Sequence, residues 1–469
     1  MLPAFRPATS RALIDRARGL RNVAFLLLLA ATLADCTRYR AQSLGTRSTL
    51  PERIPDLTID PRQMPLPELA AHRFDPADGL DMTEVAMLAV ANSPQLKVAR
   101  ATAGVAYAQA FAAGLLPDPR FNAVFDRPDA GQAAKTIAYI MGVTVDVVGT
   151  LTRSPRYAAA RQDARRTDLN LLWMEWQVVS QARTLFVQLT QQQRLMEVLQ
   201  QTHALFESRN QLTQTALARG LLTLDAVSPH LVALNDVSRQ INDLERLMNL
   251  SRHDLNDLLG LGPEVVVPLV GPVTLPEIDE AAVARLLPDL PRRRPDLIAL
   301  QAGYAAEDFR YRAAIRAQFP VLDVAFHRAR DATDVNTMGV GFNVILPLFN
   351  GNRGAIAVEQ ATRQQLYVEY EQGLNAANSG IDRILAEQRI NRRQLRDIDA
   401  ALVELTRAAA LSDAAFRERA INTLAFTSLQ ASLLAKRIER VNLTLMILQQ
   451  RVALQTLIGG ELPVRLTQK

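Results

Sequence analysis

The sequence predicts a mainly α-helical protein with a small β part, in which a helix-strand-strand-helix unit is duplicated. Three observations predict this fold class: a repeat of about 200 residues, two short strand-like runs in each copy, and unusually long stretches of helical periodicity. The segment 120–127 returns as 321–328, at an offset of 201. The segment 219–224 returns as 419–424, at an offset of 200. The shared order of these motifs indicates that one unit was copied.

The chain of 469 residues divides into four segments: a signal peptide over 1–35, an extended arm over 36–80, and two repeats over 81–265 and 280–462. No Pro/Gly/Ser-rich linker separates the repeats, so we expect the two copies to pack on each other as one body. The net charge is +5, with both signs dispersed along the helical segments. This charge pattern predicts no nucleic-acid partner.

The beginning of the chain has the pattern of an export signal, because five arginines precede an apolar run over 23–34 that is too short to span a bilayer. Cys36, the one cysteine, follows this run, so no disulfide can form within the chain. Its placement resembles the lipobox of bacterial lipoproteins, although Asp35 stands where that family normally has a small residue. The resemblance implies lipidation of Cys36 and, because Thr37 is not an aspartate, delivery to the outer membrane. Simple cleavage after Ala34 is the alternative.

The arm and the first helix come next along the chain. Residues 36–80 are rich in Pro, Arg and Asp and show no sustained period, so we expect them to lie over the body as an extended segment. An Ala-rich helix is predicted from Met82 to about Leu116, where apolar and small residues recur at helical spacing. Prolines at positions 117 and 119 end this helix.

Two strand-like runs follow the first helix of each copy. In the first copy, apolar and polar residues alternate over 121–126, and a second run covers 142–148. In the second copy, the runs cover 322–328 and 338–348. Each run is close to the ~9 to 11 residues that a tilted strand needs to cross a bilayer. We therefore expect membrane-length strands in both copies.

Each copy ends in a very long helix and a shorter return helix. Helical periodicity runs from about 156 to 217 and from about 354 to 415, with no internal proline. About 60 residues at ~1.5 Å per residue give a rod of roughly 90 Å, which needs packing partners along its length. Apolar residues on heptad-like steps between Val178 and Phe206 favour coiled-coil packing. A turn near Gly220 or Ala420 ends each rod.

The strands of one chain are too few to close a barrel. Strand edges cannot be left exposed in hydrocarbon, and the smallest membrane barrels have about 8 strands. Three chains would supply about twelve strands, and the long helices that continue from them would form a tube beneath the barrel. Such an assembly has the architecture of a conduit.

Three motifs carry a resemblance to a known family: the helix end Ala113-Gly-Leu-Leu-Pro-Asp-Pro119, the strand exit Leu346-Pro-Leu-Phe-Asn-Gly-Asn-Arg353 and the turn Arg219-Gly-Leu-Leu-Thr-Leu-Asp225. Together with the repeat order, they make residues 80–462 similar to the TolC-like outer-membrane efflux proteins, the outer-membrane factors of tripartite efflux pumps. The first copy departs from the family at its strand exit, where Val147-Val-Gly-Thr-Leu-Thr-Arg153 replaces the Pro-Leu-Phe-Asn pattern.

The resemblance implies a homotrimeric channel with an outer-membrane β-barrel of about 12 strands, continued by a long periplasmic α-helical barrel. Its implied partners are a periplasmic adaptor (membrane fusion) protein, an inner-membrane pump and outer-membrane lipid. The implied function is passive export of small molecules or ions that the pump delivers, with most of the chain in the periplasm. Two alternatives stay open: the exit duct of a type I protein secretion system, and a periplasmic coiled-coil scaffold that is lipid-anchored through Cys36 and forms no barrel.

In this family the turns between the long helices form the periplasmic tip, where the channel opens and the adaptor binds. Gly220, Thr223 and Asp225 match the family's glycine, hydroxyl and acid in the first copy. The second copy has Ala420 and Thr423 at the matching places, so it lacks the glycine, and the acid is missing as well. The resemblance thus assigns the tip, its gate and the adaptor contact to these residues.

Two tip residues have two possible roles each. A ring of Asp225 side chains from all subunits could hold the entrance shut or attract cations, because like charges in a narrow pore focus the field. Alternatively, Asp225 caps or solvates a turn. Phe426 would either plug the closed tip or lie buried between helices, and burial is the commoner role of phenylalanine.

No catalytic or cofactor site is predicted. The five histidines are scattered and lack the paired spacing and nearby cysteine of a metal site. No nucleophile elbow and no pair of carboxylates stands out. We therefore expect a protein without enzymatic activity, bound metal or cofactor.

Overall fold

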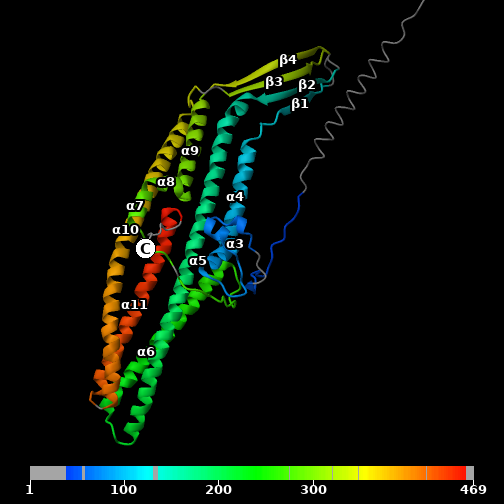
Figure 1. Ribbon diagram of the computed structural model, residues 1–469. Helices are drawn as coiled ribbons and strands as arrows, with labels where there is room; N and C mark the ends of the chain where they lie inside the picture. Colours follow the sequence, from blue (N-terminus) through cyan, green and yellow to red (C-terminus); the bar gives the residue numbers. More distant parts are fainter. Residues whose placement is uncertain are drawn as a thin grey trace, which may run out of the picture. The chain divides into compact units, whose positions relative to one another are not determined.

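The structure is a computed structural model that describes residues 39–54, 59–129, 136–273, 275–318, 321–346, 348–418 and 420–460 (Figure 1). The chain has two compact units, Met1–Thr49 and Leu50–Lys469. In the first unit, the described residues 39–49 contain no helix or strand. The predicted signal peptide and Cys36 lie outside the described residues, so export and lipidation stay predictions.

The arm is more regular than the sequence suggests. It contains a short 3-10 helix, η2 (Pro61–Gln63), and a short α-helix, α2 (Pro67–Ala71), where only an extended segment is predicted. Both helices begin with a proline, whose fixed φ is already helical. Leu69 and Leu80 are fully buried in the core. Within the second unit, residues 50–80 therefore pack on the helices, and Leu69 of α2 supplies one of the apolar contacts.

The first repeat begins with two helices, α3 (Met82–Asn92) and α4 (Pro94–Ala113). The predicted single helix from Met82 to Leu116 is therefore wrong. The break has a local cause, because a proline disfavours the helical conformation of the residue before it, and Ser93 has a ψ of 124°. α3 starts with a capping box in which Asp81 and Glu84 each accept backbone N–H groups.

The second repeat begins in the same way. Three short elements, α7 (Glu280–Leu286), η3 (Leu287–Asp289) and α8 (Leu290–Arg293), precede α9 (Pro295–Arg316). A proline again follows a residue with extended backbone, since Arg294 has a ψ of 121°. The duplication therefore preserves the helix break as well as the helices.

The four strands form one antiparallel sheet in the order β1-β2-β3-β4. They are β1 (Arg120–Asp126), β2 (Ala138–Asp146), β3 (Val321–Arg330) and β4 (Asn336–Ile345), close to the predicted runs. β2 starts earlier than predicted and gives its last two predicted residues to the next helix, while β4 ends before Leu346. The β2–β3 pairing joins the two repeats into one sheet.

Each copy continues into a long helix and a return helix. The first pair is α5 (Val147–Ala218) and α6 (Leu224–Leu259), and the second is α10 (Arg353–Arg417) and α11 (Thr423–Ile458). α5 has 72 residues and α10 has 65, so both exceed the predicted length. α5 also contains Pro155, because it begins directly after β2 with Asp146 as its N-cap. Among the described residues, no helix combines the length and apolar character needed to cross a membrane.

Helix packing gives the second unit two main cores. The larger core lies where α3, α5 and α6 meet the arm, and another lies among α9, α10 and α11. The heptad positions of α5 between Val178 and Phe206 are buried, apart from the partly buried Met196, which confirms the coiled-coil prediction. Figure 1 shows the sheet at one end of these helices and both hairpin turns, α5–α6 and α10–α11, at the other end.

Candidate functional site

The turn between α5 and α6 is open and is held by backbone hydrogen bonds. The N–H of Leu221 donates to the carbonyl of Ala216 at 2.9 Å, and the N–H of Gly220 donates to the carbonyl of Leu217 at 2.9 Å. This pair of bonds is a Schellman motif, which requires a left-handed residue. Gly220 supplies it with a φ of 70°. Added side-chain atoms at Gly220 would meet open space, so the glycine is needed for its backbone angle.

The start of α6 presents two polar side chains to solvent. Thr223 is the N-cap residue, yet its side chain makes no capping bond. Asp225 lies in the first turn and is exposed, and it makes no hydrogen bond or ion pair with the rest of the described chain. A negative charge is favourable there because the N-terminus of a helix carries partial positive charge. Asp225 is thus free to act on something outside this chain.

The turn between α10 and α11 is built differently. The N–H of Ala420 donates to the carbonyl of Ala415 at 2.8 Å, and the side chain of Asn422 caps α11 by accepting from the N–H of Ala425 at 2.8 Å. Thr423 is the first residue of α11 and is buried.

These contacts correct the predicted alignment of the two turns. Helix ends pair Thr223 with Asn422, an offset of 199, whereas the sequence pairs Thr223 with Thr423 at 200. The sequence alignment follows two identical letters, Thr-Leu, and the fold follows the position of the N-cap. Thr423, whose hydroxyl the sequence assigns to the second turn, is therefore a buried residue of α11.

An aromatic cluster lies beneath the second turn and connects three helices. The ring of Phe426 stacks on Phe416 with centroids 4.9 Å apart, and His230 of α6 contacts both rings edge-on at 5.7 and 5.8 Å. Phe426 and His230 are both fully buried. Phe426 is therefore packed between helices, the commoner of its two predicted roles. In this chain its side chain is not exposed to a pore or to an adaptor.

An ion pair closes one side of this cluster. Arg209 of α5 donates to Asp413 of α10 at 2.5 Å, and Arg417 pairs with the same carboxylate. The guanidinium carbon of Arg209 also lies 6.0 Å from the centre of the Phe426 ring. Side chains from α5, α6, α10 and α11 thus meet within about three helical turns of the tip.

The environment of His230 makes it a neutral base. Burial is the main cause, and the nearby charge of Arg209 is the second, and together they lower the pKa of His230 from its usual 6.5 to about 4. Neither ring nitrogen has a hydrogen-bond partner among the described residues. A proton on this ring would therefore be unpaired and next to another cation.

Sequence reasoning did not identify His230, Arg209, Asp413 or Phe416. One signal was available for the aromatic pair, because Phe416 and Phe426 flank the turn at similar distances, and such positions face each other across a helical hairpin. The histidine and the ion pair have no such signal, because their partners come from a different repeat.

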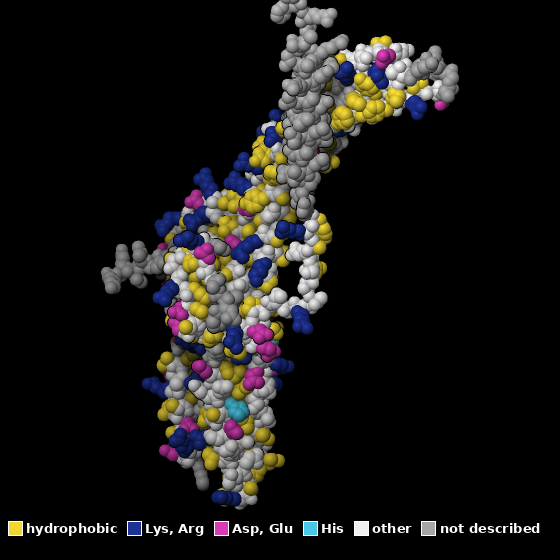
Figure 2. All heavy atoms as spheres, turned by 90° about the vertical axis from the view of Figure 1, so that its right-hand side faces the viewer, with side chains coloured by type: hydrophobic (Ala, Val, Ile, Leu, Met, Phe, Trp, Pro, Cys, Tyr) yellow, Lys and Arg dark blue, Asp and Glu magenta, His cyan; other side chains and the backbone are white. Residues whose placement is uncertain are grey.

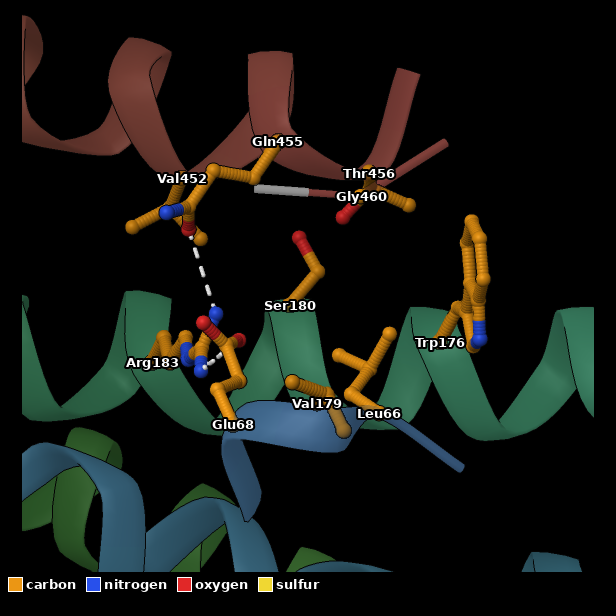
Figure 3. A pocket seen from close by; sticks show the side chains of 10 residues that line it. All are labelled: Leu66, Glu68, Trp176, Val179, Ser180, Arg183, Val452, Gln455, Thr456 and Gly460. Atoms are coloured by element: carbon orange, nitrogen blue, oxygen red, sulfur yellow. Dashed lines mark hydrogen bonds and ion pairs between the residues drawn. The ribbon is translucent and has the colours of Figure 1, made fainter. Parts of the chain in front are cut away.

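A second group of residues, between the arm, α5 and α11, is a structural clamp (Figure 3). Arg183 of α5 donates to Glu68 of the arm at 2.5 Å and to the side chain of Gln455 of α11 at 3.2 Å. The hollow beside them holds about 20 Å³. This volume fits about one water molecule, so the group joins three segments and does not hold a substrate.

A third group, His72, Asp81 and Glu84, brings one imidazole and two carboxylates together at the start of α3. The carboxylates are already engaged, since both oxygens of Glu84 and one oxygen of Asp81 accept backbone N–H groups. His72 lies 3.4 Å from the other oxygen of Asp81. These contacts explain the cluster as a helix cap with an imidazole beside it.

The sheet presents two unlike faces, and its register identifies them. Cross-strand partners share a face, and successive rows alternate between faces. The apolar face carries the row Phe121, Val143, Phe326 and Val340. The polar face carries the next row, Asn122, Gly142, His327 and Gly339. The side chains of the apolar row are exposed, from 39% for Val143 to 70% for Phe121.

Comparison with known proteins gives a consistent result. A family model described as outer membrane efflux protein matches residues 286–460, most of the second repeat. The chain is 23% identical over 337 residues to the multidrug resistance outer membrane protein MdtP of Escherichia coli (strain K12), a match covering 69% of this chain and 68% of that protein.

Solved structures share the fold over nearly the whole chain. The outer-membrane channel OprN matches with a TM-score of 0.70 at 16% identity, over 90% of this chain and 99% of that chain. The CmeC outer membrane channel of Campylobacter jejuni matches with a TM-score of 0.69 at 14% identity, over 91% of this chain and 95% of that chain. The second repeat is thus similar to the outer membrane efflux protein family, and nearly the whole chain shares the fold of the outer-membrane channels.

Proposed function

We propose that this protein is the outer-membrane exit duct of an efflux system, a passive channel and not an enzyme. The observation that carries the proposal is the sheet, whose apolar face is exposed while its other face is polar and rich in glycine. An exposed apolar surface of this kind needs lipid or protein to cover it. β2 continues directly into α5, which has 72 residues, and β4 leads through a short connection to α10, which has 65, so both helices are long enough to extend the conduit into the periplasm.

The assembly that fits this sheet is a homotrimer. β1 and β4 are the edge strands within the chain, and each pairs on one side only. Joining β4 of one subunit to β1 of the next closes a barrel of about twelve strands when three chains meet. The apolar face then contacts lipid and the polar face lines the water-filled lumen. This arrangement leaves no strand edge in the membrane.

The tip is the proposed site of gating and adaptor binding. Gly220, Thr223 and Asp225 are exposed there, and three Asp225 carboxylates would attract cations to the entrance. Ala420 is also exposed and adjoins the second turn. An inner-membrane pump and a periplasmic adaptor would deliver the cargo. Because MdtP is named for multidrug resistance, small toxic molecules are the cargo class we propose.

The test compares two substitutions at adjacent positions of β2. Val143→Asp places a charge on the apolar face, and Thr144→Asp places the same charge on the polar face. Only Val143→Asp should impair insertion, since a charge that faces lipid destabilises a barrel, for Asp by less than the ~2–4 kcal/mol that Arg or Lys costs at the bilayer midplane. Heat-resistant trimers and discrete conductance steps in planar bilayers are the measurements.

The same recordings test the tip. Asp225→Asn should reduce the preference for cations over anions without changing trimer yield, because the side chain makes no contact within the described chain. A wild-type protein that gives no conductance and stays water-soluble after removal of residues 1–36 would overturn the channel proposal in favour of a periplasmic scaffold. Retention of a secreted protein substrate, and not of small molecules, would favour a type I secretion duct.

A further inference from the structure

Two loops at the junction of the sheet and the helices carry exposed apolar side chains. The entry loop (114–119) connects α4 to β1, and the exit loop (346–352) connects β4 to α10. Leu115 and Leu116 of the entry loop are 55% and 60% exposed. In the exit loop, Leu348 is 76% exposed and Phe349 is 100% exposed. Large apolar side chains gathered at such exposure indicate a surface that a partner covers.

The two loops lie at opposite edges of the layer that the chain forms. β1 and β4 are the edge strands of the sheet (Figure 1). The helices below follow the same order, since α4 packs on α5, α5 on α9, and α9 on α10. Figure 2 shows hydrophobic side chains on the sheet and on the adjoining ends of the helices. The exposed loops thus continue the two edges at which a neighbouring subunit joins the sheet.

The two copies differ at this junction as their positions in the sheet require. In the first copy, β2 passes directly into α5 at Val147, with no loop between them. In the second copy, the connection from α9 to β3 (317–320) is shorter than the entry loop and lacks its pair of leucines. β2 and β3 are interior strands that pair with each other. The two long apolar loops therefore belong to the two junctions at an edge.

The two edge junctions also carry opposite charges. Asp118 of the entry loop is exposed, and so is Arg353, which follows the exit loop as the first residue of α10. Neither side chain has an ion pair or a hydrogen bond with any described residue. Complementary charges favour the pairing of one edge with the other over the pairing of two like edges. The partner that offers both the second apolar loop and the opposite charge is another copy of this chain.

The stagger of the strands brings the two loops to the same level. The pairing row of Arg120 runs through Thr144 and Ala325 to Gly341. Toward the helices, β2 extends two residues beyond this row, and β3 and β4 extend four, so that β4 ends at Ile345. The ends therefore step along the sheet in one direction, as in a barrel of tilted strands. One more step across the seam places the start of the next subunit's β1 level with the exit loop.

We propose that the exit loop of one subunit packs on the entry loop of the next, with Phe349 against the two leucines and Arg353 beside Asp118. The contact rests on the proposed function, because only a ring that joins β4 to β1 brings the loops together. It closes the seam at the level where the strands end and the helices begin. The contact also gives one shared role to two motifs of the sequence, the helix end before β1 and the strand exit after β4.

The test is disulfide cross-linking of the full-length protein that carries both Leu116→Cys and Phe349→Cys. Within one chain these positions lie about three strand spacings apart, roughly 14 Å, and a disulfide bridges only ~7 Å between Cα atoms. Oxidation should therefore link the double variant into covalent trimers on non-reducing gels. Each single-cysteine variant retains Cys36 and reveals any link that Cys36 makes.

A matched control pair combines Leu116→Cys with Leu151→Cys. Leu151 is 69% exposed, but it lies on α5 at the interior junction, beside the entry loop of its own chain. This pair should give no covalent trimers. Random collision between subunits would link both pairs alike, and that result would overturn the contact.

Two further variants test the chemistry of the contact. Phe349→Ala should raise the fraction of free monomer after mild heating by about tenfold or more, because a large apolar side chain no longer becomes buried. Leu151→Ala should leave this fraction unchanged. Asp118→Arg should also weaken the trimer, and Arg353→Asp in the same chain should restore it. Equal dissociation of Phe349→Ala and wild type would overturn the apolar contact, even if the cysteines react.

Mass in detergent and conductance of the same samples separate this contact from the proposed function. A conducting trimer in which the double variant links no better than the single variants refutes the contact alone and assigns the loops to the lipid interface. A monomeric protein without conductance refutes the proposed function, and the contact with it.

Discussion

The two hairpin turns at the tip share one fold but differ in how they are held. The α5–α6 turn is held by backbone hydrogen bonds and a glycine, and the side chain of its N-cap residue makes no capping bond. Leu221 and Leu224 are 70% exposed there. The α10–α11 turn has a working cap at Asn422 and a buried Phe426 that stacks on Phe416. The first copy thus has an open turn, and the second copy has an anchored one.

This difference suggests a division of labour between the copies. An exposed turn with leucines and a free carboxylate is suited to bind a partner, and a turn tied to neighbouring helices is suited to hold the tip in one shape. Residues that act on partners are therefore expected in the first copy, and residues that set the stability of the tip in the second. The predictions below test this contrast in order of expected effect.

The largest effect is expected from Phe426→Ala. Truncating a fully buried phenylalanine typically costs about 3–5 kcal/mol, because transfer energy is lost and a cavity remains. Hydrogen exchange of the first turns of α11 should accelerate to match that of the α5–α6 turn. Leu424→Ala, at a side chain that is 60% exposed, is the matched control and should change exchange little. Equal protection in Phe426→Ala and wild type would remove the basis of the contrast.

Acid should loosen the second turn in the same way. The pKa of His230 lies near 4 in the folded protein and at its usual 6.5 when unfolded, so the unfolded form binds more protons between these values. The stability of the tip is therefore complete above pH 6.5 and falls by about 2 kcal/mol at pH 5. The charges that face His230 are Arg209 and, behind it, Asp413.

The measurement is local hydrogen exchange of α11 between pH 7.5 and pH 5, corrected for the intrinsic rate. His230→Phe keeps an aromatic ring in the cluster and should abolish the pH dependence. If that variant shows the wild-type pH profile, another group titrates and the assignment to His230 fails.

The smallest effect separates the two helix caps. Asn422→Ala should destabilise the start of α11 by about 1 kcal/mol, because its side chain accepts from the N–H of Ala425. Thr223→Ala should have almost no effect, because its side chain makes no capping bond. Comparable losses in thermal shift or local exchange for the two variants would show that both caps work in the assembled protein.

The long-range order of the fold was predictable from the sequence, and the exact pairing of its parts was not. Heptad spacing along α5 and the alternation in the strands record which side chains are buried, so helices, strands and the duplication could be predicted. The helix break before Pro94 was missed, although a proline at that position signals it. The predicted alignment of the two turns differed from the structure by one residue, because the sequence alignment matched the identical residues Thr-Leu and the structure matches the N-cap positions.

The tip residues were located only in part. A family motif places Gly220, Thr223 and Asp225 at the turn, where the structure also has them. The contacts that hold the tip join α5 and α6 to α10 and α11, and nothing local in the sequence encodes such long-range partners. The two faces of the sheet likewise need the register of all four strands before the side toward lipid can be assigned.

The open edges of the sheet have a genetic consequence. β1 and β4 are different surfaces, so a ring in which β4 of one subunit pairs with β1 of the next uses heterologous contacts. Every subunit therefore takes part in two interfaces, one through β1 and one through β4. A subunit whose β1 or β4 cannot pair then disrupts every ring into which it assembles. If the ring has three chains, as proposed, then a cell that makes equal amounts of intact and damaged chains would have only about one ring in eight free of defects. Mutations confined to β1 or β4 should therefore be dominant, whereas truncations that prevent folding should be recessive.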